Sequence, residues 1–177
     1  MQALPRFFNP QANTMLLGAA LLLAVYGMGR LQSRAPENEV LAGVEPVVVT
    51  EAGIVFEARM DTGAAISSVH AEDIEVIDGH PTELAQNQGK FVKFTLVNER
   101  KARARLKARI EEVQMIRTGD CREYRYHVYL TLAHRGRGQR VLVNLNDRHY
   151  SSQRMLIGRN WLEAGYVVDI RRDPGRP

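Results

Sequence analysis

From residue 47 onward, the hydrophobic residues fall into short runs that are rich in Val, Ile, Phe, Tyr and Thr. Turn-forming clusters, such as Asp78-Gly79 and Gly136-Arg137-Gly138, separate many of these runs. Such a pattern is typical of strands joined by tight turns. It predicts strands at 47–50, 53–60, 91–97, 126–132, 141–145 and 166–170. The domain is therefore predicted to be all-β, closed or strongly curved into a barrel.

One stretch near the C-terminal end has a helical signal. Residues 160–164 (NWLEA) follow a Gly-Arg turn, and Gly165 is placed to end a helix in the left-handed conformation. We therefore expect one short C-terminal helix.

Residues 101–109 (KARARLKAR) alternate strictly between basic and apolar positions. A period of two places all five cations on one face of a strand, whereas a helix would spread them around its axis. This face is either a solvated outer surface or a track for an anionic ligand, with Arg103, Arg105 and Lys107 as tentative substrate-binding residues. Nucleic acid is the least favoured ligand, because the stretch has no aromatic residue that could stack on bases. No nucleic-acid partner is predicted.

The N-terminal region contains an uncharged apolar run at 15–29 (MLLGAALLLAVYGMG). As a helix it would span about 22 Å, which is shorter than a hydrocarbon core of about 30 Å. This length is typical of a signal-peptide core or of a short anchor that takes in the flanking residues. We therefore predict an N-terminal hydrophobic helix at 14–31 that acts as a transmembrane anchor or signal segment.

The domain following this segment is expected outside the cytoplasm. The predicted location is the bacterial inner membrane with the domain in the periplasm, or the periplasm itself after cleavage. Basic residues flank the run almost equally, so charge alone does not set its orientation. The predicted organisation is an N-terminal segment (1–13), the anchor or signal (14–31), a polar linker (32–46), the globular domain (47–171) and a tail (172–177).

The composition of the chain limits which kinds of functional site it can contain. The chain is 45% hydrophobic and 25% charged, as ordinary globular proteins are, and its formal charge of +4 permits anionic partners without selecting one. Cys121 is the only cysteine, which excludes an intrachain disulfide and a zinc site built mainly on thiolates. The sequence has neither a His-Glu-x-x-His pair nor a phosphate-binding Gly-x-x-x-x-Gly-Lys-Ser/Thr loop. No metal and no cofactor are predicted.

Two motifs carry the strongest chemical signal. Asp61-Thr-Gly-Ala64 follows the apolar stretch 54–60, and Met155-Leu-Ile-Gly-Arg-Asn160 joins another apolar stretch to the expected helix. Either motif alone is weak, because an Asp-Thr-Gly turn is common, but the pair is specific. Together they resemble the signature of the retropepsin-like aspartic peptidases.

The resemblance extends over roughly residues 47–171. It is closest to a bacterial family labelled ATP-dependent zinc protease, with matching segments at 61–71, 91–96, 122–132 and 146–170. The sequence has no motif that supports the zinc or the ATP of that label. The family is associated with glutamate-ligating enzymes, which makes an acidic, glutamate-rich peptide an attractive substrate.

The resemblance implies a closed acid-protease barrel and assigns roles within the two motifs. Asp61 would be the catalytic carboxylate, and the hydroxyl of Thr62 would lock two active-site loops together. Gly63 would allow the backbone to turn and direct an N–H group at the carboxylate. Ala64, Gly158 and Arg159 would support the loop, with Arg159 structural and not catalytic.

Aspartic peptidases need two carboxyl groups. One takes a proton from water, and the other, protonated, polarises the scissile carbonyl group. This chain has one such motif, so a dyad requires a homodimer with two Asp61 residues at its twofold axis. The leading hypothesis is thus a homodimeric aspartic endopeptidase that acts on a peptide or protein substrate. The alternatives are a non-catalytic peptide- or partner-binding module, and a membrane-bound assembly factor that uses its basic face on anionic lipid or polymer.

Overall fold

The computed structural model describes residues 38–118 and 121–173, which belong to one compact unit that begins at Asn38. The predicted anchor or signal segment at 14–31 lies outside the described residues. In the part of the chain that the structure describes, we find no helix with the length and hydrophobicity needed to cross a membrane.

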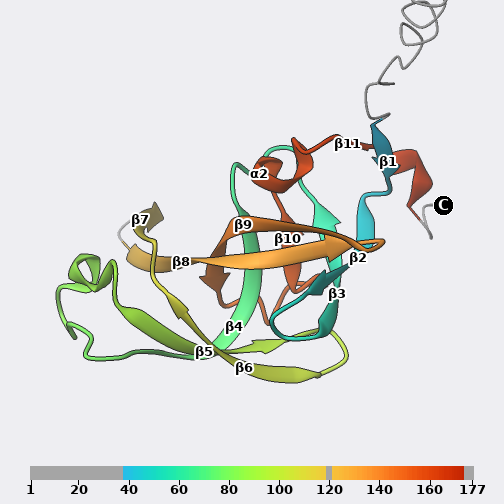
Figure 1. Cartoon of the computed structure of the whole chain (residues 1–177). Helices are drawn as coiled ribbons and strands as arrows, with labels where there is room; N and C mark the ends of the chain where they lie inside the picture. Colours follow the sequence, from blue (N-terminus) through green and yellow to red (C-terminus); the bar gives the residue numbers. More distant parts are fainter. Residues whose placement is uncertain (1–37, 119–120, 174–177) are drawn as a thin grey trace, which may run out of the picture. The chain divides into compact units, whose positions relative to one another are not determined.

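Six strands form a closed barrel (Figure 1), in agreement with the all-β prediction. Around the ring the order is β10-β3-β2-β8-β9-β4, and pairing of β4 with β10 closes it. The strands are β2 (Val44–Val49), β3 (Ile54–Met60), β4 (Ser67–Val76), β8 (Cys121–His134), β9 (Arg137–Asn146) and β10 (Met155–Ile157).

The alternation of residue type along each strand determines which side chains point into the barrel. In β3, Phe56 and Ala58 are fully buried, whereas Val55 and Arg59, which flank them, are exposed and face outward. Because successive side chains of a strand point to opposite faces, the apolar set of every strand meets in one core. Burial of these apolar side chains is the main source of stability of the barrel.

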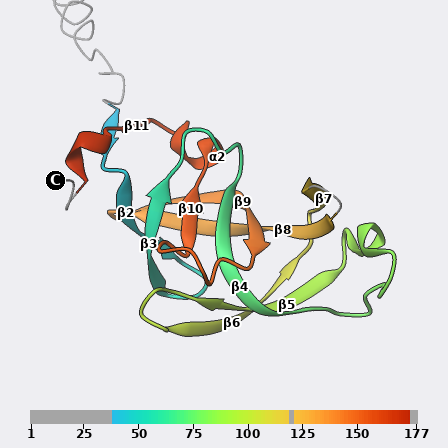
Figure 2. The ribbon, with the colours of Figure 1, turned by 180° about the vertical axis from the view of Figure 1, so that it is seen from behind.

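Three further strands extend the barrel. β5 (Phe91–Val97) pairs with β4 and β6 (Arg103–Arg109), and β7 (Glu112–Thr118) pairs with β8. A short 3₁₀ helix, η1 (Leu84–Asn87), lies between β4 and β5. Figures 1 and 2 show β5 and β6 on the side of the barrel opposite to the helix α2 (Arg159–Leu162). The inward residues of β5, such as Phe94, join the same core.

A two-stranded parallel sheet joins the two ends of the domain. β1 (Glu39–Leu41) pairs with β11 (Tyr166–Val168), and the fully buried Leu41 joins the core. β1 and the start of β2 fall inside 32–46, which the sequence analysis assigns to a linker. A polar stretch with two prolines and no clear period gives no local strand signal, and the pairing partner of β1 is far away in the sequence.

The predicted helix is present, although it begins one residue earlier than expected. α2 follows Gly158, and its Trp161 is fully buried. The indole N–H of Trp161 donates to the carbonyl of Leu132 at 3.2 Å, and its ring stacks on Tyr166 at 4.2 Å. The predicted strand at 166–170 is shorter in the structure, because the chain turns into the 3₁₀ helix η2 (Ile170–Arg172).

Candidate active site

The loop that carries Asp61 crosses the end of a third strand. β3 and β4 are consecutive in the chain, yet β10 lies between them, parallel to β3 and antiparallel to β4. The backbone N–H of Asp61 donates to the carbonyl of Ile157, the last residue of β10, at 2.9 Å. Two segments almost a hundred residues apart in the sequence therefore fix the position of Asp61.

The carboxylate of Asp61 is oriented by its own loop. Its Oδ1 atom accepts the backbone N–H groups of Gly63 at 2.9 Å and of Ala64 at 3.2 Å. Asp61 is half-buried, and Thr62 and Gly63 are exposed. A Cβ atom at position 63 would lie 3.1 Å from Oδ1, so glycine gives the N–H group room to approach. No described residue donates a hydrogen bond to Oδ2.

Arg159 holds the backbone of this loop. Its Nη1 atom donates to the carbonyl oxygens of Thr62 at 3.1 Å and of Gly63 at 2.9 Å. Its own backbone N–H donates to the carbonyl of Ala64 at 2.8 Å. Since the guanidinium group is directed at carbonyl groups, its contacts are those of a residue that supports the loop.

A second set of hydrogen bonds joins the start of β4 to α2. Oδ1 of Asn160 accepts the backbone N–H of Ser67 at 3.0 Å and its hydroxyl at 2.9 Å, and Nδ2 donates to the carbonyl of Leu142 at 2.7 Å. The Oγ atom of Ser67 accepts the backbone N–H of Gly158 at 3.0 Å. The sequence motifs assign no role to Ser67 or Asn160, although Asn160 belongs to the second motif.

The three tentative substrate-binding residues lie away from the Asp61 loop. Arg103, Arg105 and Lys107 share the exposed face of β6, on the side of the barrel opposite to α2 (Figures 1 and 2). Arg103 forms an ion pair with Glu72 of β4 at 2.8 Å, and Arg105 forms one with Glu75 at 3.4 Å. The hydrogen bond from Arg103 lowers the pKa of the Glu72 carboxyl group. Two of the three cations thus have carboxylate partners within their own chain.

Polar residues extend from the Asp61 loop across the outer face of the barrel. Strand register aligns one residue from each of five neighbouring strands, and core residues on either side of them point inward. This outer row consists of Arg59, Leu156, Ser68, Asn144 and His127. Arg59 precedes Asp61 by two residues, so the outer row passes about 7 Å from the Asp61 loop.

Three members of the outer row are buried although they face away from the core. Ser68 is 7% exposed, Asn144 is 8% exposed and His127 is 0% exposed. Their Oγ, Oδ1 and Nε2 atoms, respectively, have no hydrogen-bond partner among the described residues. The outer row therefore holds three buried polar atoms without a hydrogen-bond partner in the described chain, although Nδ1 of His127 is paired with Glu112 at 3.4 Å.

The buried histidine of the outer row makes stability depend on pH. Burial lowers the pKa of His127 below its usual value of 6.5, and Arg125 acts in the same direction, whereas Glu112, 3.4 Å from Nδ1, raises it. The unfolded chain therefore takes up a proton at higher pH than the folded chain does. Neutral His127 therefore contributes its full stabilisation of the folded state above pH 6.5. The free energy of unfolding should fall as the pH drops from 6.5 through the pKa of the folded state.

Urea unfolding between about pH 7 and pH 5 would measure this dependence. The variant His127→Gln, which cannot titrate, should show a shallower loss of stability over that interval than the unmodified protein. Equal slopes for the two proteins would contradict the assignment.

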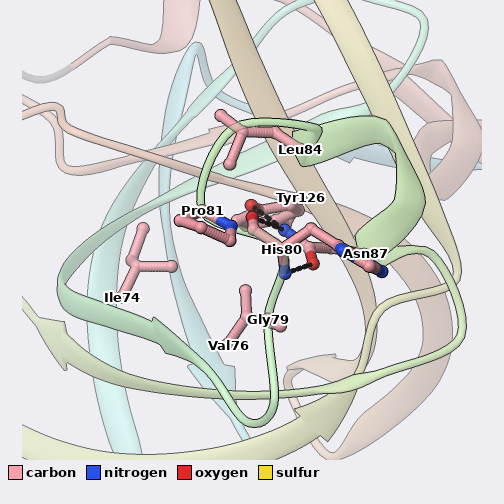
Figure 3. A pocket seen from close by; sticks show the side chains of 8 residues that line it. All are labelled: Ile74, Val76, Gly79, His80, Pro81, Leu84, Asn87 and Tyr126. Carbon is pink, nitrogen blue, oxygen red and sulfur yellow. Dashed lines mark hydrogen bonds between the residues drawn. The ribbon is translucent and has the colours of Figure 1, made fainter.

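A pocket of about 250 Å³ lies at the other end of β4 (Figure 3). Asn87 of η1, which is 1% exposed, donates to the hydroxyl of Tyr126 at 2.9 Å and accepts the backbone N–H of His80 at 2.7 Å. Ile74 and Val76 supply apolar walls. Because β4 begins near the Asp61 loop and ends at this pocket, the pocket is separate from the candidate active site.

The fold and the loop define a class of protein. A closed barrel whose Asp-Thr-Gly loop crosses a strand leading into Gly-Arg-Asn is the arrangement of the retropepsin-like aspartic endopeptidases. The family model of the RimB-like proteins, described as retropepsin-like aspartic endopeptidase RimB, matches residues 40–176. The chain belongs to this family, which confirms the resemblance drawn from its two motifs.

A solved structure has a similar fold. It is the protein Lpg0085 of Legionella pneumophila subsp. pneumophila str. Philadelphia 1, whose function is unknown. The two share 21% sequence identity with a TM-score of 0.58, over 75% of this chain and 94% of that one. This likeness supports the fold alone. No curated protein matches the chain.

Proposed function

We propose that the protein is an aspartic endopeptidase that acts as a homodimer, in which each subunit contributes Asp61 to a shared catalytic dyad. The observation that carries the proposal is the geometry of Asp61. Its carboxylate is held by two N–H groups through Oδ1, it is only half-buried, and it forms no ion pair with a described residue. A carboxylate arranged in this way can accept a proton.

The exposed part of the loop favours pairing with a second copy. Thr62 and Gly63 lie beside Asp61 and are exposed in the single chain. A twofold axis at this loop would bring the same three residues of both subunits together, as isologous contacts require. The network around Arg159 and Asn160 would hold each loop in place while the two meet.

Within such a dimer, the two carboxyl groups would share one proton, because two like charges about 3 Å apart cannot both ionise. The ionised group takes a proton from a water molecule, whose oxygen attacks the scissile carbonyl carbon. The protonated group donates to the carbonyl oxygen as it becomes an oxyanion. When the tetrahedral intermediate collapses, the carboxyl group that took a proton from water donates it to the nitrogen of the leaving group, the peptide bond breaks, and the oxyanion's proton returns to the other carboxylate.

Activity should therefore depend on the concentration of dimers. Addition of about a tenfold excess of Asp61→Asn subunits should reduce the activity per unmodified chain to about a tenth, because most unmodified chains would then sit in mixed dimers. A fluorogenic peptide assay after equilibration measures this loss, with excess Asp78→Asn subunits as the control. Activity per unmodified chain that stays constant in the mixture would show that one chain suffices and would contradict the dyad.

The substrate proposed with this activity is an acidic peptide. A protein that bound such peptides at the Asp61 loop without cleaving any of them would instead be a binding module on the same barrel.

A further inference from the structure

The pocket at the far end of β4 opens where the hydrophobic core meets solvent. Val76 of β4 and Tyr126 of β8 line the pocket and also pack against the core. Ile74, two residues before Val76, lines it as well, and its side chain is 39% exposed. A ligand bound in this pocket would therefore extend the core and cover apolar surface that water now contacts.

The polar groups of the pocket are arranged around the side-chain amide of Asn87. Its Oδ1 atom accepts the backbone N–H of His80 at 2.7 Å, and this bond sets which end of the amide carries the oxygen. Nδ2 therefore points to the other side, where it donates to the hydroxyl of Tyr126 at 2.9 Å and to the carbonyl of His80 at 3.3 Å. Both N–H groups of the Asn87 amide are thus used within the protein.

The hydroxyl group of Tyr126 keeps one hydrogen bond to give. Its oxygen accepts from Asn87, so its single O–H group is directed at another atom. Among the described residues, no acceptor takes this proton. Because Tyr126 lines the pocket and is only half-buried, a ligand in the pocket can supply the acceptor.

The lining of the pocket disfavours a charged ligand. Its described residues include no carboxylate, ammonium or guanidinium group. Figure 3 shows apolar side chains around the hydrogen-bonded group: Ile74, Val76, Pro81 and Leu84. A charged ligand would lose its hydration here without gaining an ion pair, which costs more than the burial of an uncharged group.

The volume of the pocket limits the ligand to a small molecule. The pocket measures about 250 Å³. An engineered protein cavity of about 150 Å³ holds benzene, and sites for drug-sized molecules begin at about 300 Å³. A ring of the size of benzene with one short substituent therefore matches the pocket.

We propose that this pocket binds an uncharged small molecule that has an apolar body and a hydrogen-bond acceptor, and that the acceptor receives the O–H group of Tyr126. Such a ligand would contact β4, β8 and the segment that contains η1. The pocket is separate from the Asp61 loop, so this inference does not depend on the proposed peptidase function.

Titration of the ¹⁵N-labelled full chain with acetophenone, followed by NMR, tests the pocket. Benzoate is the matched probe, because it has nearly the same shape and also carries oxygen acceptors but is charged. At about pH 8, where a histidine side chain is ordinarily neutral, acetophenone should shift the backbone amide signals of Ile74, Val76 and Leu84 saturably. We expect a Kd of about 1 mM or below for acetophenone, and binding of benzoate that is weaker by at least about tenfold.

Two variants locate the ligand. Tyr126→Phe removes only the hydroxyl group and should weaken the binding of acetophenone by about 3- to 10-fold. Tyr129→Phe, on the same strand but outside the lining of the pocket, should leave the binding unchanged. Ile74→Asp removes an apolar wall and should weaken binding by at least about tenfold. Its control is Val167→Asp, because Val167 of β11 is similarly exposed, at 46%, and lies outside the pocket.

Three results would overturn the proposal. They are the absence of saturable shifts with acetophenone, equal affinities for acetophenone and benzoate, and equal affinities of Ile74→Asp and Val167→Asp for acetophenone. None of these measurements requires peptide cleavage, so a failure of the proposed peptidase function would leave the result at the pocket unaffected.

Discussion

Replacement of Asp61 with asparagine should abolish peptide hydrolysis and leave the barrel folded. An asparagine side chain has nearly the same size, and its oxygen can still accept the N–H groups of Gly63 and Ala64 that orient Oδ1. It cannot take a proton from water at neutral pH, so the general base is lost. We expect a fall in kcat of several orders of magnitude, where each factor of ten corresponds to about 1.4 kcal/mol of barrier.

The measurement is kcat on a peptide that the unmodified protein cleaves, together with thermal unfolding of both proteins. Asp78→Asn is a matched control, because Asp78 is exposed in a turn beyond the far end of β4. Its activity should equal that of the unmodified protein. Residual activity of Asp61→Asn within tenfold of the unmodified protein would place the catalytic group at another residue.

Gly158→Ala should have the largest effect on stability. A Cβ atom at this position would lie 2.7 Å from the carbonyl carbon of Ile66, 2.9 Å from its oxygen and 3.0 Å from the carbonyl oxygen of Ala64. These are backbone atoms of the Asp61 loop, so no side chain can rotate to make room. Relief of the clash requires the loop to move away from β10, which would break the hydrogen bond from Gly158 to Ser67. The free energy of unfolding should fall by about 1–3 kcal/mol or more.

Urea unfolding measures this loss, and the activity of the folded fraction should fall as well, because Arg159 and Asp61 move with the loop. Gly138→Ala is the comparison, since a Cβ atom there first meets the side chain of Thr131 at 3.3 Å. Its cost should be below about 1 kcal/mol. Equal losses for the two variants would show that the contact with the loop backbone is not the cause.

Local patterns in the sequence predict much of the barrel. The alternation of basic and apolar residues at 101–109 matches the alternating exposure of β6, and the helix signal at 160–164 is displaced by one residue. β4 escaped prediction, because its second half carries charged outward residues and an irregular register between Glu72 and Glu75. β1 escaped because its only partner is β11. Pairing between strands so far apart in the sequence gives no signal in the residues of either strand alone.

The candidate active site also has one part that the sequence predicts and one part that it does not. Asp61, Gly63 and Arg159 stand in short motifs, so their residue types and spacing were visible in the sequence. The outer row was not visible, because Ser68, Asn144 and His127 become neighbours only through the register of three strands. For the basic face of β6, the sequence predicted the local structure but not the contacts. Its periodicity indicated a strand correctly, but periodicity gave no information on the carboxylates of β4 that pair with it.

Closure of the barrel by β10 has a consequence for the order of events during synthesis. The ring is complete only when Met155–Ile157 has entered between β3 and β4, and the Asp61 loop takes its backbone contacts from Ile157, Arg159 and Asn160. On the ribosome, Asp61 emerges long before these residues do. Contacts between residues so distant in sequence also form slowly, because their loop-closure entropy must be overcome first. A nascent or truncated chain that ends before β10 therefore has Asp61 but not the loop geometry, and under the proposed function it would cleave no peptide until β10 has been made.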